Sequence, residues 1–126
     1  MKILIVEDDK STLTLIQHFL RDAGHEIVTC RNGEEGLKLV RETTPDLAMI
    51  DGLIPGIHGF ELCKTIKEDP ALPKKPKVIL MSSVYRKMKY RSEVAEYKAD
   101  AFLVKPFEKE DLIETIDSLF TKAPGR

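Results

Sequence analysis

The sequence predicts an α/β protein in which a five-stranded parallel sheet carries five helices on its two faces. Short aliphatic runs alternate along the chain with stretches whose apolar residues recur at helical spacing, and this alternation indicates repeated strand-helix units. The runs Ile3–Val6, Leu47–Ile50 and Val78–Met81 are apolar throughout, which is typical of parallel strands buried on both faces. A chain of 126 residues fits a single domain whose core needs no disulfide or structural metal.

The first two strand-helix units lie in the N-terminal third of the chain. A strand over Lys2–Glu7 is followed by a helix that stops at Gly24, a residue type that commonly caps helix C-termini. A second strand covers Glu26–Cys30, and Asn32 with Glu35 three residues later is the start signature of a second helix. The apolar positions that define the two helices are Leu13, Ile16, Leu20 and Ala23 in the first and Leu37 and Val40 in the second.

The middle of the chain contains the third strand, the third helix and the fourth strand. Leu47–Ile50 follows Pro45 and runs into Asp51, after which three glycines and a proline indicate a loop. The third helix is defined by Leu62, Cys63 and Ile66. Three prolines and three lysines between residues 70 and 77 then predict a solvated connection to the fourth strand, Val78–Met81.

The last third of the chain contains a weaker helical pattern, a strand and a final helix. Residues 91–98 predict the fourth helix, and Ala101–Val104 predicts the fifth strand. The final helix is defined by Leu112, Ile113, Ile116, Leu119 and Phe120. We expect one domain over residues 1–122, followed by a frayed tail over residues 123–126.

The charge balance and the cysteine content argue against several classes of protein. Twenty basic and 21 acidic residues give a net charge of −1, so no basic surface for nucleic acid or an anionic membrane is expected. The apolar run after the N-terminus is too short for a signal peptide or a membrane span. Cys30 and Cys63 form no CxxC pair, which indicates two packed thiols in a reducing compartment. We therefore expect a cytoplasmic protein.

Polar residues of related chemistry follow four of the predicted strands. Glu7 and Asp8 follow the first, Asp51 the third, Ser82 the fourth and Lys105 the fifth. The carboxyl ends of parallel strands meet at one edge of a sheet, so we expect these side chains to converge. Two like charges about 4 Å apart repel by roughly 4 kcal/mol at an effective dielectric of about 20, so the acids require a cation. Mg²⁺ is favoured because it accepts carboxylates, waters and phosphate oxygens together.

This set of residues suits phosphoryl transfer. Asp51 stands alone at its strand end before an open loop, so it is the candidate nucleophile that forms an acyl phosphate, whereas Glu7 and Asp8 are better placed to hold metal. The sequence has no Walker-type loop and no GxGxxG, so the phosphate is not expected to belong to a nucleotide. Taken alone, Asp51 is typical of a turn, Lys105 of a surface and Asp9 of a helix start. Only their joint placement predicts a site.

The sequence resembles the receiver domain of two-component response regulators over nearly its whole length. The matching segments are ILIVEDD, AMIDGLIPGIHGFEL, VILMSS and AFLVKPF, in the order and at the spacing of that family. The resemblance implies a doubly wound, flavodoxin-like sheet with strand order 2-1-3-4-5. It also implies that residues 1–122 form the receiver domain.

The resemblance also implies how the acidic residues are used. Asp51 would accept a phosphoryl group from a phosphohistidine on a sensor histidine kinase or a histidine phosphotransfer protein. Asp8 would ligate Mg²⁺ together with Asp51 and the backbone carbonyl of Leu53, and Glu7 would act through water.

A second group of residues would respond to the phosphoryl group, again by resemblance. Ser82 would bond a phosphoryl oxygen in the active state, and Lys105 would form an ion pair with it. The peptide bond between Lys105 and Pro106 is cis in the family. Phe102 stands at the aromatic switch position, where many members have tyrosine, so any coupling here must act through packing.

The main interpretation is a signalling switch that passes its state to a downstream effector protein through the face of the fourth helix, fifth strand and fifth helix. Phosphorylation-dependent homodimers are a family expectation. The alternative is a small Mg²⁺-dependent phosphohydrolase with an aspartyl-phosphate intermediate, against which the short loops and missing cap segment argue. A flavodoxin-like cofactor carrier is a third class, but no phosphate-binding loop supports it.

Three local features of the sequence carry separate expectations. Leu53 and Val84 occupy positions that tune dephosphorylation in the family, and neither side chain can orient water, which predicts a long-lived phosphoryl group. His58 is more typical of a solvent-facing loop residue than of a pH sensor. The segment Tyr85–Arg91 interleaves two tyrosines with four cations; it would fit an acidic partner or single-stranded nucleic acid, but a solvated loop is favoured.

Overall fold

A computed structural model of the chain describes residues 1–21, 23–54, 56, 58–82 and 96–120. Five strands form one parallel sheet in the order β2-β1-β3-β4-β5, which confirms the predicted strand order. The strands are β1 (Lys2–Val6), β2 (Glu26–Cys30), β3 (Leu47–Asp51), β4 (Lys77–Ser82) and β5 (Ala101–Val104). The helices within the described part of the chain are α1 (Lys10–Arg21), α2 (Gly33–Thr43), α3 (Gly59–Glu68) and α5 (Lys109–Phe120).

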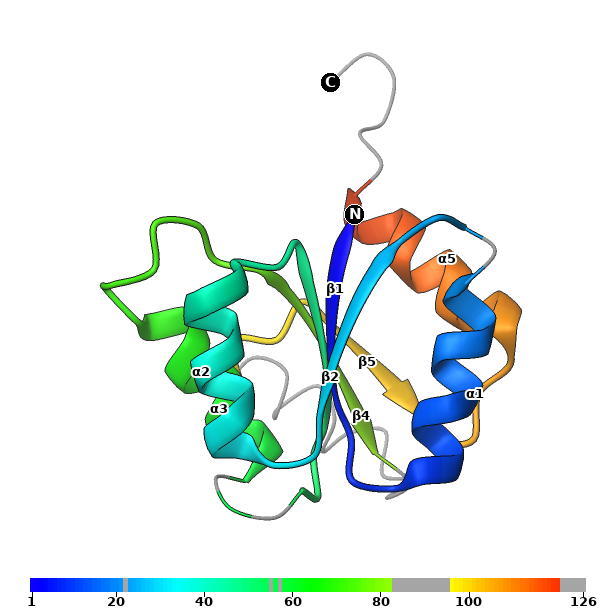
Figure 1. Cartoon of the computed structure of the whole chain (residues 1–126), viewed down its shortest axis with the longest axis horizontal. Helices are drawn as coiled ribbons and strands as arrows, with labels where there is room; N and C mark the ends of the chain where they lie inside the picture. Colours follow the sequence, from blue (N-terminus) through cyan, green and yellow to red (C-terminus); the bar gives the residue numbers. More distant parts are fainter. Residues whose placement is uncertain (22, 55, 57, 83–95, 121–126) are drawn as a thin grey trace.

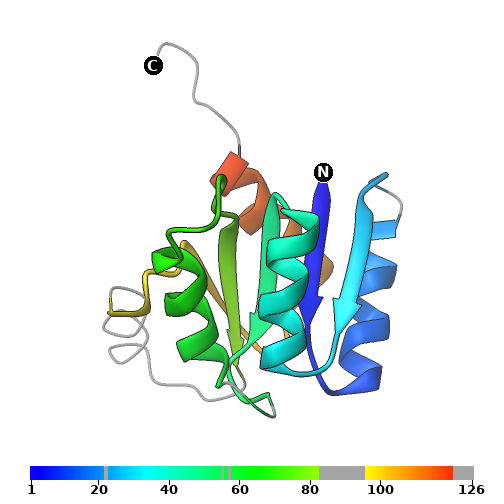
Figure 2. The same ribbon diagram turned by 60° about the vertical axis from the view of Figure 1, so that its left-hand side comes forward.

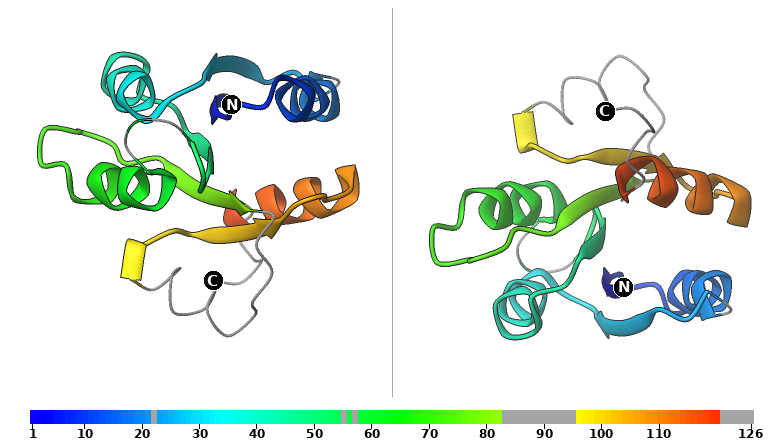
Figure 3. Two further views of the ribbon diagram at one scale, coloured as in Figure 1. Left: turned by 90° about the horizontal axis from the view of Figure 1, so that it is seen from below. Right: turned by 90° about the horizontal axis from the view of Figure 1, so that it is seen from above.

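Helices cover both faces of this sheet. Helices α2 and α3 lie against one face, and α1 and α5 lie against the other (Figure 1). The turned view in Figure 2 and the end-on views in Figure 3 show the same three layers, with the strands of the sheet running between the two helix pairs. The predicted doubly wound α/β class is therefore confirmed.

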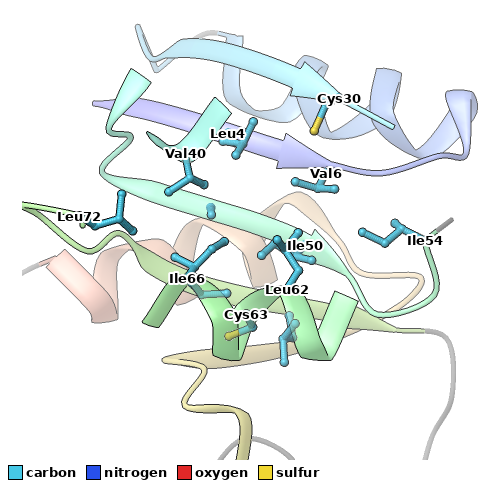
Figure 4. Close-up of a cluster of buried hydrophobic side chains, with 13 residues drawn as sticks. Leu4, Val6, Cys30, Val40, Ile50, Ile54, Leu62, Cys63, Ile66 and Leu72 are labelled. Carbon is cyan, nitrogen blue, oxygen red and sulfur yellow. The ribbon is translucent and has the colours of Figure 1, made fainter. Parts of the chain in front are cut away.

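Successive residues of each central strand enter two different cores. Leu4, Val6 and Ile50 pack with α2 and α3 in the first core (Figure 4), whereas Ile3 and Met49 pack with α1 and α5 in the second. Because a strand alternates its side chains between the faces of the sheet, burial on both faces requires continuous apolar runs. All of these residues are fully buried, which explains why the runs in the sequence do not alternate.

The element boundaries follow the predictions closely, with differences at a few ends. Strand β1 ends at Val6, not Glu7, because Glu7 keeps only a backbone hydrogen bond to Cys30 of β2 before the chain turns away. Strand β4 extends beyond its aliphatic run at both ends, from Lys77 to Ser82. At the start of α2, the Asn32 side chain accepts a hydrogen bond from the Glu35 backbone N–H, as its capping signature indicates.

The prediction of a fourth helix falls mostly outside the described residues. Glu96 and Tyr97 are helical, and the rest of the predicted stretch up to residue 95 is not described. Val84, the basic loop Tyr85–Arg91 and the predicted tail also lie outside the described residues. Among the helices that the structure does describe, none combines the length and the apolar character that a membrane crossing demands.

The two cysteines are free thiols inside the core, as predicted. Burial, together with the charge of the nearby Glu35, raises the pKa of Cys30 to about 12. Burial likewise raises the pKa of Cys63 to about 12, and the Cys63 thiol donates a hydrogen bond to the Tyr97 carbonyl. Since the thiolate is the reactive form, both thiols are chemically silent in the folded protein.

We expect a disulfide reagent at pH 8 to modify neither cysteine on the timescale on which it modifies the unfolded chain. With a pKa of about 12, only about one thiol in 10,000 is ionised at that pH, against roughly one in four for a free cysteine. The measurement is the rate at which the reagent's own thiol is released by reaction with the protein, in buffer and in denaturant. Two thiols titrating rapidly in buffer would contradict the buried placement.

Candidate functional site

The strand register brings the polar residues of four strand ends to one edge of the sheet. Val6 pairs with Ile50, so Glu7 and Asp51 follow at the same level of two adjacent strands. On the other side of β3, Asp51 pairs with Met81, and Ser82 is the next residue of β4. Ser82 in turn pairs with Val104, which precedes Lys105. This is the carboxyl edge of the parallel sheet, where open α/β proteins bind ligands.

Three carboxylates meet at this edge. One carboxylate oxygen each of Glu7, Asp8 and Asp51 lies within 4.8 Å of the others. Glu7 is fully buried and Asp51 is 7% exposed, whereas Asp8 is half-buried. Backbone amides hold two of the carboxylates, because Asp9 N–H donates to Glu7 Oε2 over 3.2 Å and Leu53 N–H donates to Asp51 Oδ1 over 3.2 Å.

Lys105 forms ion pairs with two of these acids. Its Nζ lies 2.5 Å from Glu7 Oε1 and 3.3 Å from Asp51 Oδ2. The lysine follows β5, and its backbone N–H donates to the Ser82 carbonyl over 2.8 Å, which fixes where the side chain starts. The Lys105–Pro106 peptide bond is cis, as the family resemblance implies.

The electrostatics of the site show that its charge is incompletely balanced. The pKa of Glu7 is raised to about 7, mainly by burial; the hydrogen bond with Lys105 lowers this net value, and the neighbouring Asp51 contributes to the rise. Burial lowers the pKa of Lys105, but its bonds to Glu7 and Asp51 outweigh that effect and leave the pKa above its ordinary value. A single lysine therefore faces more negative charge than it neutralises.

The donor set fits a hard divalent cation. All three groups offer carboxylate oxygens, at least two of them are held in place by backbone amides, and their mutual repulsion is relieved by positive charge. Half-buried Asp8 leaves the cluster open toward solvent on one side, so waters and a phosphate oxygen could reach an ion held there. Mg²⁺ is one of the hard ions that such carboxylate ligands accept.

Asp9 is separate from this cluster. Its exposed carboxylate accepts hydrogen bonds from the Thr12 backbone N–H at 3.1 Å and from the Thr12 hydroxyl at 2.5 Å. These bonds lower the pKa of Asp9. They also give two donors in the first turn of α1 a partner. Asp9 therefore caps a helix, in line with the helix-start interpretation of the acidic triplet.

The loop between Asp51 and α3 is fitted closely to the end of β3. The Gly59 backbone N–H donates to the Gly52 carbonyl over 3.2 Å, and the Gly52 N–H donates to Met81 of β4 over 2.8 Å. A Cβ atom at Gly59 would overlap the carbonyl oxygen of Asp51 and the Cα of Gly52. Only glycine lets the start of α3 approach the backbone beside Asp51 so closely.

The remaining predicted residues lie around this centre. Ser82 is buried at the end of β4, and Phe102 of β5 is half-buried against the core on the α3 side. Leu53 is 55% exposed beside Asp51. His58 is an exposed residue that caps α3, since its Nδ1 accepts a hydrogen bond from the Phe60 N–H at 3.4 Å.

Two residues at the site have no signal in the sequence. Arg31, in the loop after β2, donates from Nη2 to the Asp8 carbonyl over 3.0 Å and so braces the segment that carries Asp8. Phe60 lies with its ring edge against Gly52. The approach of each to its partner depends on loop paths, which hydrophobic spacing does not encode.

A doubly wound parallel sheet with an acid cluster and a lysine at its carboxyl edge fits the class of signalling domains that phosphorylation switches. The chain belongs to the response regulator receiver domain family, whose model matches residues 3–117. It is similar to the alkaline phosphatase synthesis transcriptional regulatory protein PhoP of Bacillus subtilis, with 30% identity over 122 residues, 97% of this chain and 49% of PhoP. This and the phosphate regulon regulator PhoB of Rhizobium meliloti are transcriptional response regulators, which are signalling proteins and not enzymes.

Solved structures show the same fold. The chemotaxis response regulator CheY4 of Vibrio cholerae matches with a TM-score of 0.84 and 28% identity, covering 94% of this chain and 97% of that one. A CheY-like receiver domain protein of Methanospirillum hungatei matches with a TM-score of 0.80 and 28% identity, covering 94% of this chain and 91% of that one. The chain spans about half the length of the two curated regulators, 49% of PhoP and 53% of PhoB.

Proposed function

We propose that this receiver domain, over residues 1–122, is a phosphorylation-dependent switch whose phosphoryl acceptor is Asp51. The observation that carries the proposal is the convergence of Glu7, Asp8 and Asp51 with Lys105 at one edge of the sheet. Asp51 is the acceptor because it ends a central strand, with one carboxylate oxygen held by the Leu53 N–H and the other near Lys105.

The proposed reaction is an in-line transfer from a phosphohistidine. A carboxylate oxygen of Asp51 attacks the phosphorus, the bond from phosphorus to the donor imidazole breaks, and the imidazole leaves with the bonding electron pair and takes up a proton. Asp8, Asp51 and the Leu53 carbonyl would hold Mg²⁺, with Glu7 acting through water. When bound, that ion neutralises the phosphoryl oxygens. Lys105 moves from Asp51 to the new phosphoryl group and keeps an ion pair there.

An effector would recognise the state of the switch on the face that includes β5 and α5. Ser82 bonds a phosphoryl oxygen in the active state, and Phe102 changes its position in response, which biases a two-state equilibrium. The proposed partners are a sensor histidine kinase or a phosphotransfer protein, a downstream effector, and a second copy of the domain when phosphorylated. The proposed location is the cytoplasm.

Labelling with a small phosphodonor such as acetyl phosphate tests the function. We expect the protein to take up one phosphoryl group in Mg²⁺ and to lose at least about 90% of that labelling when a chelator is added, because the repelling acids then lack their cation. Mass spectrometry of the intact protein measures the uptake. A protein that is not labelled in Mg²⁺, or that is labelled equally in chelator, would contradict the proposal.

The phosphoryl group is expected to be long-lived, with a half-life of minutes or more. Leu53 is exposed beside Asp51 and its apolar side chain offers no group that orients an attacking water. Leu53→Asn should shorten the half-life severalfold, and Leu53→Ile, which stays apolar, should not. A half-life of seconds in the unaltered protein would contradict this prediction.

A further inference from the structure

Phe60 occupies the space beside the residue that follows the phosphoryl acceptor. It is the second residue of α3, and its half-buried ring lies against Gly52, so that a Cβ atom at Gly52 would be 2.7 Å from Phe60 Cε2 and 3.0 Å from Cζ. The ring therefore fills the position that a side chain at residue 52 would take. This makes the two residues a complementary pair at the end of β3.

The same ring contacts the aromatic side chain at the switch position. The centroid of Phe60 is 6.3 Å from that of Phe102 with the planes 22° apart, and 5.4 Å from that of Tyr97 with the planes 42° apart. On its outer side the ring stacks on His58, with centroids 5.3 Å apart. Phe60 thus connects the end of β3 with β5, although β4 lies between these two strands in the sheet.

The backbone around this contact leaves little room for independent movement. Gly52 is bonded to Met81 on one side and to Gly59 on the other, and Gly59 packs directly against the Asp51 carbonyl. Closely packed segments move together because their contacts do not stretch. A displacement of Asp51 or Gly52 is therefore passed to the first turn of α3, which carries Phe60.

We propose that Phe60 is a positioning residue that transmits the state of the acceptor to Phe102 through the packing of its ring. Phosphorylation shifts the backbone at Gly52, the shift moves the Phe60 ring, and the ring sets the position of Phe102. The inference rests on the proposed function of Asp51 and adds to Ser82 a second side chain through which that function reaches β5.

The first test follows Phe102 by fluorine NMR. The five phenylalanines are replaced biosynthetically by 4-fluorophenylalanine, and the Phe102 resonance is assigned from its loss in Phe102→Leu. We expect Mg²⁺ with beryllofluoride, at saturation, to shift this resonance in the unaltered protein. In Phe60→Leu the shift should fall by at least half at the same occupancy. Phe19→Leu, which removes a ring from the core on the opposite face, should leave the shift unchanged.

The second test needs no phosphoryl mimic. Gly52→Ala introduces the Cβ that meets the Phe60 ring edge, so it should displace the ring and shift the Phe102 resonance of the resting protein. In the Phe60→Leu background the same Gly52→Ala change should produce no shift. If Phe60→Leu does not fold, Phe60→Met keeps the volume without the stacking geometry and serves in both tests.

The outcomes separate this inference from the function on which it rests. An unaltered protein that does not bind the mimic would remove the proposed function, while the Gly52→Ala comparison would still test the packing path. A Phe102 shift of equal size with and without the Phe60 ring, in either test, would overturn the inference. Loss of the shift in Phe60→Leu but not in Phe19→Leu supports it.

Discussion

Asp51→Asn is expected to abolish stable labelling by acetyl phosphate in Mg²⁺, with a loss of at least about 100-fold. The amide oxygen is a far weaker nucleophile than a carboxylate, and the substitution removes one negative charge from the metal cluster. The fold should survive, because the Leu53 N–H that now donates to Asp51 Oδ1 can donate to the amide oxygen. Intact-mass analysis measures the labelling, and circular dichroism checks the fold.

Asp9→Asn is the matched control for this experiment. Asp9 is an acid at the same edge of the sheet, but its carboxylate bonds to Thr12 and caps α1. Asparagine is as good a helix cap as aspartate, so the control should keep both its stability and its labelling. Wild-type labelling of Asp51→Asn would place the acceptor elsewhere. Equal loss in both variants would show a general effect of charge.

Gly59→Ala is expected to destabilise the protein by about 3 kcal/mol or more, or to prevent folding. The added Cβ would overlap the Asp51 carbonyl oxygen and Gly52 Cα, both backbone atoms in a hydrogen-bonded loop that cannot move aside cheaply. Any protein that does fold should also label poorly, since relief of the overlap moves Asp51, the proposed acceptor. Urea unfolding measures the free energy of unfolding.

Gly24→Ala provides the comparison, at a glycine where an added Cβ meets no neighbouring atom. Gly24 has a φ of 76° but no atom within 4 Å of an added Cβ, so the substitution costs only the backbone strain of about 1 to 2 kcal/mol. Its labelling should be unchanged, because the residue lies at the opposite end of the sheet from Asp51. A Gly59→Ala variant as stable as Gly24→Ala would mean that α3 does not pack on the Asp51 backbone as described.

Much of the fold could be predicted because the physical signals are local. Apolar runs at β1, β3 and β4 are continuous since both faces of the sheet are covered, and Asn32 shows where α2 begins through a bond to its own neighbour, Glu35. The prediction was less good at strand ends. Whether Glu7 extends β1 depends on pairing with a second strand, which sequence spacing does not report.

The two aspartates that flank β3 show what the parallel sheet by itself assigns. Asp51 lies at the carboxyl end of the strand and meets Lys105, whereas Asp46 precedes the strand at the other end, where it pairs with Lys74 and accepts from the Lys2 N–H. The end of the strand at which an aspartate lies is enough to separate a candidate site residue from a structural one. That separation is available from the sequence once the strands are known to be parallel.

The sequence by itself determined the five strands, helices α1, α2, α3 and α5, and the edge where Glu7, Asp8, Asp51 and Lys105 gather, because parallel strands bring their carboxyl ends together. Only the tertiary structure decided how that edge is built. Lys105 lies between Glu7 and Asp51, Arg31 braces the Asp8 carbonyl, and the Phe60 ring fills the space over Gly52 and reaches Phe102. These contacts join segments far apart in the chain, so they depend on side-chain volume and loop path, which residue type and spacing do not specify.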